Sequence, residues 1–298
     1  MTTITNPIVP GWYADPEARY YEGQYWVYVT RSFTAYTDQM NLDAFSSEDL
    51  VHWTKHEAIV RMADFPHIHR AVWAPTIIEQ GGRYYLIFAS NDIQSDDAVG
   101  GLEIAVADGP QGPFTRHIGG ILVDRFHNQA QPIDAHLFKD DDGVIYLYYG
   151  GWSHCNVAVL NGDLTGFVPH ADGSIFQEIT PPKYVEGPCM VKKDGIYYFM
   201  WSSGNWTDGS YCVQYCAAQS PYGPFDTAAT VLQAGAIAEG PGHHGYLYHR
   251  QSGQWLIVYH RRILGDREPG HRMLCIDRLH IEDGKIAPVT MTDSWRIG

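Results

Sequence analysis

The sequence lacks the features that mark nucleic-acid-binding and membrane-spanning proteins. Its 20 Lys and Arg are outnumbered by 34 Asp and Glu, and no basic run is longer than the pair Arg261-Arg262. Because binding to nucleic acid needs clustered positive charge, the net charge of −14 predicts no nucleic-acid partner. No apolar stretch reaches the roughly 18 residues that a transmembrane helix requires, so we expect no membrane span.

A signal peptide and a cysteine framework are also missing. Residues 1–10 contain neither a basic segment nor an apolar core, which predicts a cytoplasmic protein as written, or a secreted or periplasmic one if a leader has been removed. The 5 cysteines are odd in number and irregularly spaced, with no C-x2-C pair. We interpret them as reduced, small apolar side chains rather than as zinc ligands or disulfide partners.

Aromatic residues, by contrast, are abundant. The chain has 9 Trp, 20 Tyr and 11 Phe, and apolar residues make up 45% of it. β-strands favour aromatic side chains, and flat rings also stack on the faces of sugars. Since long helical periodicity is absent as well, the composition predicts an all-β protein with a sizeable core.

A repeat organises the chain. Each copy runs from a short polar segment into a strand, a Gly-containing turn and a Tyr-rich strand, and successive copies start 52 to 60 residues apart. The copies cover residues 15–28, 74–88, 134–149, 186–200 and 240–259. Each leaves room for two further strands, and five four-stranded units predict a five-bladed β-propeller that forms one catalytic domain over residues 1–298. A pair of β-sandwiches would explain the strands but not the five-fold repeat.

The predicted ring needs a closure. Residues 272–281 form an additional strand after the fifth copy, and we expect it to pair with the N-terminal chain so that no sheet edge stays open. The acidic run at residues 140–142 precedes Gly143 in a predicted hairpin, and we interpret it as a solvated turn.

The first positions of the five copies are Asp15, Ala74, Asp134, Glu186 and Gly240. The innermost strands of a propeller converge on its axis, so three carboxylates at one repeat position are expected to meet there. Converging acids shift one another's pKa values apart, which lets one site hold both an acid and a base at neutral pH. Taken singly, each acid could equally be a turn or strand-cap residue.

These residues resemble glycoside hydrolase family 43, whose members are five-bladed propellers that invert anomeric configuration. The resemblance spans nearly the whole chain and rests on Trp12-Tyr13-Ala14-Asp15-Pro16, the segment from Ser46 to Trp53, Val72-Trp73-Ala74-Pro75, the segment from Ile133 to Phe138, Glu186-Gly187-Pro188, Gly240-Pro241-Gly242-His243 and His271-Arg272. It implies that Asp15 is the general base, Glu186 the general acid, and Asp134 the carboxylate that orients the acid and keeps its pKa high.

The resemblance implies further site residues. His243 matches a central histidine that contacts a calcium ion in many members, although calcium prefers oxygen ligands and His244 could exchange roles with it. Arg272 matches an arginine that binds sugar hydroxyls. Substrate contacts are also expected from residues near the pocket, with core packing or a surface role as the alternative: Trp73, Phe33 and Glu239, and beyond these Trp12, Trp152, Trp201 and Trp206.

The family's activities define the functional alternatives. We expect an exo-acting, inverting glycosidase that releases terminal α-L-arabinofuranosyl residues from plant-type oligo- or polysaccharides, with β-D-galactofuranosidase and then β-D-xylosidase as alternatives. Family xylosidases usually carry an additional C-terminal domain, for which this chain has no room. A non-catalytic sugar-binding propeller is the competing class. WD and kelch propellers are disfavoured because their signatures are absent. The sequence leaves the oligomeric state open.

Overall fold

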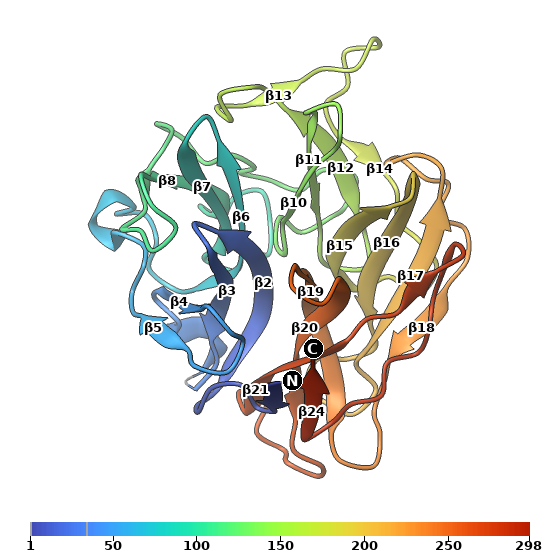
Figure 1. Cartoon of the computed structure of the whole chain (residues 1–298). Helices are drawn as coiled ribbons and strands as arrows, with labels where there is room; N and C mark the ends of the chain where they lie inside the picture. Colours follow the sequence, from blue (N-terminus) through green and yellow to red (C-terminus); the bar gives the residue numbers. More distant parts are fainter. Residues whose placement is uncertain (1, 34) are drawn as a thin grey trace.

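The computed structural model describes residues 2–33 and 35–298. Five β-sheets are arranged radially around a common axis (Figure 1), which confirms the predicted all-β, five-bladed propeller. The innermost strands of neighbouring sheets contact one another in a closed ring. The two 3₁₀ helices of the described chain, η1 (Tyr36–Asp38) and η2 (Met62–Asp64), have three residues each and could not span a bilayer.

Each blade runs outward from the axis in sequence order. Blade one comprises β2 (Tyr13–Tyr21), β3 (Gln24–Arg31), β4 (Leu42–Ser47) and β5 (Thr54–His56). Blade two comprises β6 (Val72–Gln80), β7 (Arg83–Ser90), β8 (Gly101–Ala107) and β9 (Thr115–Arg116). Blade three comprises β10 (His136–Lys139), β11 (Ile145–Tyr149), β12 (Asn156–Leu160) and β13 (Phe167–Val168), with β14 (Gln177–Glu178) also paired to β12. Blade four comprises β15 (Glu186–Lys193), β16 (Ile196–Ser203), β17 (Cys212–Ala218) and β18 (Ala229–Leu232). Blade five comprises β19 (Glu239–His249), β20 (Gln254–Arg262) and β21 (Arg272–Arg278).

Tight turns set the register of the inner hairpins. The turn residues Glu22-Gly23 and Asp194-Gly195 both have positive φ, at 51° and 83° and at 53° and 77°. This conformation matches the right-handed twist of the flanking strands, and glycine adopts it without steric cost. In the third hairpin Asp141 and Asp142 are exposed, as predicted for a solvated turn, but Asp140 is not. Asp140 is buried, and its carboxylate accepts hydrogen bonds from Lys192 Nζ at 2.5 Å and from the Tyr197 hydroxyl.

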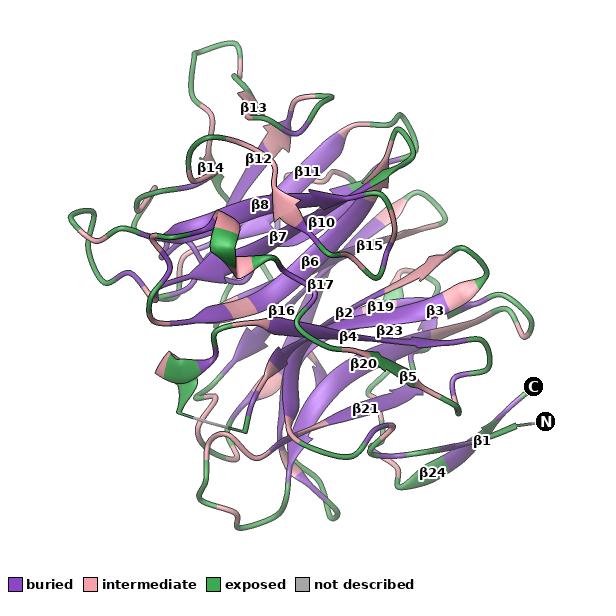
Figure 2. Cartoon of the chain, turned by 90° about the vertical axis from the view of Figure 1, so that its left-hand side faces the viewer, coloured by how far each residue is buried: buried purple, intermediate pink, exposed green. Residues whose placement is uncertain are grey.

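The core lies between the blades. Five clusters of buried apolar side chains fill the spaces between neighbouring sheets, one for each pair of blades. Figure 2 shows the resulting pattern, in which the inner strands are buried and exposure is concentrated in the turns and loops. Because both faces of the inner strands are covered, their sequences read as nearly continuous apolar runs, as in Val27–Val29 and Leu86–Phe88.

The true repeat position differs by one residue from the predicted one in blade four. Asp15, Ala74, Asp134, Gly187 and Gly240 all adopt left-handed backbone, with φ of 52°, 44°, 54°, 63° and 56°. Register shifts accompany them in β2, β6, β15 and β19. Gly187, not Glu186, is therefore equivalent to Asp15. Glu186 lies one position earlier, where blades two and five carry Trp73 and Glu239.

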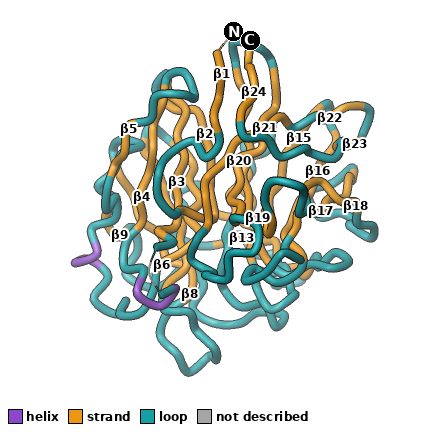
Figure 3. Tube along the Cα trace, turned by 90° about the horizontal axis from the view of Figure 1, so that it is seen from below, coloured by secondary structure: helices purple, strands orange, loops and turns teal. Residues whose placement is uncertain are grey.

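The ring closes through the N-terminal chain, in a different way from the prediction. β21 is the third strand of blade five, and residues 6–8 run beside it: Ile8 N donates to Leu274 O at 2.9 Å, and the Asn6 amide bonds both N and O of Ile276. β1 (Thr2–Thr5) pairs instead with β24 (Ser294–Ile297), so the two ends of the chain lie side by side (Figure 3). The remaining strands, β22 (Ile281–Glu282) and β23 (Lys285–Ile286), form a separate small hairpin.

A half-buried arginine joins three blades near the axis. Arg19, on β2, donates to Ile77 O of blade two at 3.3 Å and to Leu137 O of blade three at 2.8 Å, and it forms an ion pair with Glu17. Glu17 is buried and also accepts from the Thr76 hydroxyl at 2.8 Å. The arginine therefore both neutralises a buried carboxylate and ties neighbouring inner strands together.

Arg19→Met is expected to lower the free energy of unfolding by about 3 kcal/mol, because it leaves the Glu17 carboxylate buried without its guanidinium partner. Chemical denaturation followed by tryptophan fluorescence would measure the change. The double variant Glu17→Gln/Arg19→Met removes both charges and should recover at least half of the loss. A single variant as stable as the parent protein would show that this ion pair contributes nothing.

Candidate active site

A pocket of about 330 Å³ collects most of the predicted site residues. It is lined by Asp15, Asp134, Glu186, Trp73 and Arg272, together with Tyr36, Asp92, Gln94, Gln131, Ile133, Trp152 and Trp206. The lining side chains come from all five blades or the loops that join them, so the pocket exists only when the ring is closed. The three acids thus meet in one cavity, as convergence on the axis predicted.

Asp15 is held by cationic and neutral nitrogen groups. Arg272 Nη1 donates to Asp15 Oδ1 at 3.1 Å, and the Arg272 Nε donates to the Ser32 hydroxyl at 2.8 Å, which fixes the guanidinium. The backbone N–H of Asp15 donates to His260 Nδ1 at 3.3 Å. Burial and the nearby charge of Arg272 hold the pKa of His260 well below its ordinary value, so the ring is neutral. The Asp15 carboxylate is therefore oriented by a cation while its oxygens still face the pocket.

Asp134 is paired with His243. The His243 Nδ1 lies 3.3 Å from Asp134 Oδ2 and 3.9 Å from Asp15 Oδ1. Burial alone would lower the pKa of this histidine, but the negative charges of Asp134, Asp15 and Glu186 raise it to about 9. His243 is therefore an imidazolium at neutral pH. Its positive charge offsets part of the negative charge of the acid cluster. His243 itself does not line the pocket, so it acts on the acids from behind the pocket wall.

Glu186 has the electrostatic environment of a general acid. Burial and the adjacent negative charge of Asp134 raise its pKa to about 7, and Asp15 contributes in the same direction. The Tyr211 hydroxyl donates to Glu186 Oε1 at 2.7 Å and opposes the shift, since it stabilises the charged form. A carboxyl group with a pKa near 7 is still substantially protonated at neutral pH and can give a proton to a leaving group.

Tyr211→Phe should move the basic limb of the pH–activity profile upward. In the parent protein kcat/KM is expected to fall as the pH rises through about 7, because the protonated form of Glu186 is lost. Removing the hydroxyl withdraws a hydrogen bond from the carboxylate, so the pKa of Glu186 rises further and the limb shifts to higher pH. The profile of kcat/KM would measure this. An unshifted limb would mean that another group sets it.

Three packed aromatic rings line part of the pocket. The Trp73 Nε1 donates to Tyr36 O at 2.9 Å, and the two rings lie 5.7 Å apart. Tyr36 also contacts the edge of Trp206 at 6.1 Å, and the Arg272 guanidinium lies 5.3 Å from the centre of the Trp206 ring. Flat apolar surface beside a fixed guanidinium suits a ligand that has both C–H faces and hydroxyl groups. Trp73 and Trp206 therefore belong to the pocket.

Other predicted contacts lie outside the pocket lining. The Phe33 side chain is 55% exposed, and Glu239 accepts from Gly265 N at 3.2 Å in the loop after β20. Trp12 stacks on His271 at 4.3 Å, and Trp201 is fully buried in the core between blades three and four. The structure thus places Trp201 in the core, the alternative that the sequence left open.

The predicted calcium site at His243 has few candidate protein ligands. His243 is the histidine that contacts the acids, whereas both ring nitrogens of the adjacent His244 are buried without a hydrogen-bond partner. Over residues 2–33 and 35–298, no group of three or more His, Cys, Asp or Glu side chains is arranged to hold a metal. Since calcium prefers several oxygen ligands, protein side chains alone would not build its cage. Calcium binding stays a prediction.

Several residues of the site had no sequence signal. Asp92, Gln94 and Gln131 line the pocket, and Tyr211 and His260 bond the acids from outside its lining, but none of the five was predicted. Asn91-Asp92 at the end of a buried strand indicates a turn, and a single histidine in the β20 run is equally consistent with a core residue. Their placement depends on how blades are packed against one another, which the local sequence does not encode.

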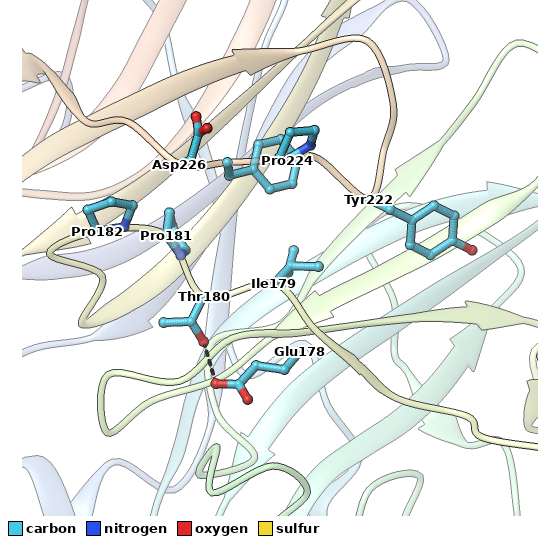
Figure 4. Close-up of a pocket in the computed structure, with 9 residues that line it drawn as sticks. Glu178, Ile179, Thr180, Pro181, Pro182, Tyr222, Pro224 and Asp226 are labelled. Carbon is cyan, nitrogen blue, oxygen red and sulfur yellow. Dashed lines mark hydrogen bonds between the residues drawn. The ribbon is translucent and has the colours of Figure 1, made fainter.

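A second hollow lies away from the acids. It measures about 680 Å³ and is formed by residues 178–182, which begin at the end of β14, and by Tyr222, Pro224, Phe225 and Asp226 between β17 and β18 (Figure 4). Its Glu178 carboxylate is already bonded to the Thr180 hydroxyl and to His154 Nδ1, both at 2.9 Å. The hollow contains none of the three acids, so the smaller pocket is the candidate active site.

Comparison with known proteins agrees with this geometry. The family model described as glycosyl hydrolases family 43 matches residues 4–286. β-D-Galactofuranosidase xynD of Aspergillus niger is 42% identical, over 98% of this chain and 86% of the fungal protein. Xylosidase/arabinosidase 43A of Humicola insolens is 26% identical, over 85% of this chain and 89% of the fungal protein.

Among solved structures, a thermostable family-43 glycoside hydrolase aligns with a TM-score of 0.82 at 24% identity, over 99% of this chain and 98% of its own. An α-L-arabinofuranosidase from Clostridium thermocellum aligns with a TM-score of 0.76 at 26% identity, over 94% of each chain.

Proposed function

The chain belongs to glycosyl hydrolases family 43, and from that premise we propose that it is an inverting exo-glycosidase that releases terminal β-D-galactofuranosyl residues from oligo- or polysaccharides. The observation that carries the choice of sugar is the 42% identity to a β-D-galactofuranosidase over 98% of this chain. The relatives named xylosidase/arabinosidase reach 24% to 30%.

The proposed reaction is a single displacement. Asp15 takes a proton from a water molecule as its oxygen forms a bond to the anomeric carbon. The bond from that carbon to the leaving oxygen breaks at the same time, and Glu186 gives its proton to that oxygen. Asp134 keeps Glu186 protonated through its negative charge, which raises the pKa of Glu186. Attack opposite to the leaving group inverts the anomeric centre.

The shape of the site supports exo action. The acids lie in a pocket of about 330 Å³ that the mutually packed rings of Trp73, Tyr36 and Trp206 also line, and a cavity of this size suits one terminal sugar more than an internal segment of a chain. Arg272 would bind a ring hydroxyl of this sugar, because it lines the pocket and is fixed by Asp15 and Ser32.

The second candidate is the α-L-arabinofuranosidase that the sequence analysis favoured. An α-L-arabinofuranoside and a β-D-galactofuranoside share the configuration of the furanose ring and differ in the exocyclic group, which carries one more carbon and hydroxyl in galactofuranose. The same acids and ring contacts would therefore serve both sugars. A relative from Bacillus subtilis named arabinoxylan arabinofuranohydrolase is 28% identical over 93% of this chain, which supports this alternative.

A panel of aryl glycosides tests the proposal. We expect kcat/KM on the β-D-galactofuranoside to exceed that on the α-L-arabinofuranoside and the β-D-xyloside by at least about tenfold, the size of difference that one lost hydroxyl contact produces. Proton NMR of the first-formed sugar should show inversion. A higher kcat/KM on the arabinofuranoside would select the second candidate, retention would refute the single displacement, and no turnover on any glycoside would favour a sugar-binding propeller.

A further inference from the structure

One side of the pocket is built from two turns with left-handed backbone. Asn91 and Asp92 follow β7 with φ of 61° and 48°, and Trp152 and Ser153 follow β11 with φ of 57° and 64°. Asn and Asp adopt this backbone more readily than other residues with a Cβ, so the strain lies mainly at Trp152 and Ser153. Such strain persists only where the surroundings impose it, and it concentrates at ligand sites. Asp92 and Trp152, one from each turn, both line the pocket.

The first turn is held rigidly by Asn91. The Asn91 Oδ1 accepts from His69 N at 2.9 Å and from Arg70 N at 3.2 Å, and its Nδ2 donates to His67 O at 2.9 Å and to Val99 O at 2.8 Å. The side chain thus makes four hydrogen bonds, all to the backbone of two flanking loops. This arrangement holds the next residue, Asp92, in one orientation.

The two oxygens of the Asp92 carboxylate differ in how many hydrogen bonds they accept. Oδ1 accepts from Gln94 Nε2 at 2.7 Å and from Gln131 Nε2 at 3.1 Å. Among the residues that the structure describes, Oδ2 has one charged partner, Arg70 Nη2, at 3.4 Å. The Asp92 side chain is only 11% exposed, so a carboxylate has been placed in a sheltered part of the pocket with acceptor capacity to spare.

Gln131 links the two turns. Its amide nitrogen also donates to Ile93 O at 2.9 Å, and its backbone O accepts from Gly151 N at 3.0 Å, next to Trp152. The Trp152 ring is 50% exposed and packs against Phe126 at 4.8 Å. The result is one continuous wall from blades two and three, with a carboxylate and a flat indole. We refer to Asp92, Gln131 and Trp152 as the polar wall.

None of the steps of hydrolysis uses the polar wall. The proposed base, its arginine and the Trp206 ring come from blades one, four and five, whereas the wall comes from blades two and three. The amide bonds to Oδ1 and the Arg70 guanidinium at 3.4 Å from Oδ2 offset part of the cost of burying Asp92, and Oδ2 can still accept from a hydroxyl donor. Among the candidate sugars, only the hexofuranose has a vicinal diol outside the ring.

We propose that the polar wall is the subsite for the exocyclic diol of a terminal galactofuranosyl residue, with Asp92 Oδ2 accepting from its terminal hydroxyl group, which arabinofuranose lacks, and the Trp152 ring covering its C–H face. This inference rests on the proposed function and names the part of the pocket that distinguishes a six-carbon from a five-carbon furanoside. Asp92 is accordingly a specificity-determining residue and takes no part in the proton transfers.

Two substitutions at Asp92 test the proposal without adding backbone strain. Asparagine and glycine both adopt left-handed backbone readily, so Asp92→Asn removes the charge and Asp92→Gly removes the side chain. We expect Asp92→Gly to lower kcat/KM on the aryl β-D-galactofuranoside by about 30-fold, the effect of losing a hydrogen bond to a charged group. Activity on the aryl α-L-arabinofuranoside should change by less than about threefold, since that sugar lacks the terminal carbon and hydroxyl that Asp92 would bind. For Asp92→Asn, we expect kcat/KM on the β-D-galactofuranoside to lie between the values of the parent protein and of Asp92→Gly.

The arabinofuranoside serves as an internal control for the integrity of the site. Asp97→Asn is the matched variant, because Asp97 lies exposed in the same loop and outside the pocket lining, and we expect both activities to be retained. Equal losses on both substrates, or no loss on either, would overturn the role of Asp92. A parent protein that cleaves the arabinofuranoside but not the galactofuranoside would refute the proposed function and the subsite with it. Selective loss of galactofuranoside activity would support both.

Discussion

Glu186→Gln is expected to lower kcat by about 10³-fold on natural glycosides, because an amide cannot supply the proton that the leaving oxygen requires. The substitution is nearly isosteric, and the amide can still accept the hydrogen bond from the Tyr211 hydroxyl, so the fold should be preserved. The basic limb of the pH profile near pH 7 should disappear with the titrating carboxyl group. Steady-state kinetics over a pH series would measure both effects.

The choice of leaving group separates loss of the acid from general damage. A dinitrophenyl glycoside leaves without protonation, so its hydrolysis by Glu186→Gln should fall by only about tenfold or less. Glu239→Gln is the matched variant. Glu239 occupies the equivalent position in blade five and is also followed by Gly-Pro, but it lies outside the pocket lining and bonds Gly265 N. It should keep near-parental turnover. If kcat fell strongly in Glu239→Gln and little in Glu186→Gln, Glu239 and not Glu186 would be the general acid.

Asp15→Asn is expected to lower kcat by about 10³- to 10⁴-fold on every substrate, whatever its leaving group, because the base acts on the attacking water. Asparagine tolerates the φ of 52° at this position, so little backbone strain is added. Insensitivity to the leaving group distinguishes this variant from Glu186→Gln. A thermal melt controls for the loss of the ion pair with Arg272. Near-parental turnover in a folded Asp15→Asn protein would contradict its role as base.

The fold was largely predictable because its signals are local and repeated. Turn residues such as Glu22-Gly23 and Asp194-Gly195 mark the hairpins, and the aromatic strands that flank them recur five times along the chain. The closure was less predictable. Residues 272–281 were predicted to form an additional strand after the fifth copy that pairs with the N-terminal chain. Residues 272–278 do contact residues 6–8, but they form the third strand of blade five, and the contact is made mainly by the Asn6 side chain. The Asn6 side chain bonds the backbone of this strand as a neighbouring strand would, and a single side chain leaves no periodic pattern in the sequence from which this could be predicted.

The identity of the three acids could be predicted from the sequence, but the pKa values of Glu186 and His243 could not. Asp15, Asp134 and Glu186 were found because their copies of the repeat place them on one axis, although Glu186 lies one residue before the true repeat position at Gly187. The raised pKa of Glu186 depends on the proximity of Asp134 and on burial, and the imidazolium of His243 depends on three acids from different blades. Such distances between blades are set by packing.

The sequence by itself determined the all-β propeller, the family and the three acids, because strand periodicity, turn residues and short motifs act over a few neighbouring residues. Only the tertiary structure decided which groups surround those acids: Tyr211 on Glu186, His260 and Arg272 on Asp15, and the polar wall across the pocket. The physical reason is that pKa values and hydrogen bonds in the pocket depend on atoms brought together from different blades, and nothing in the local sequence specifies those separations.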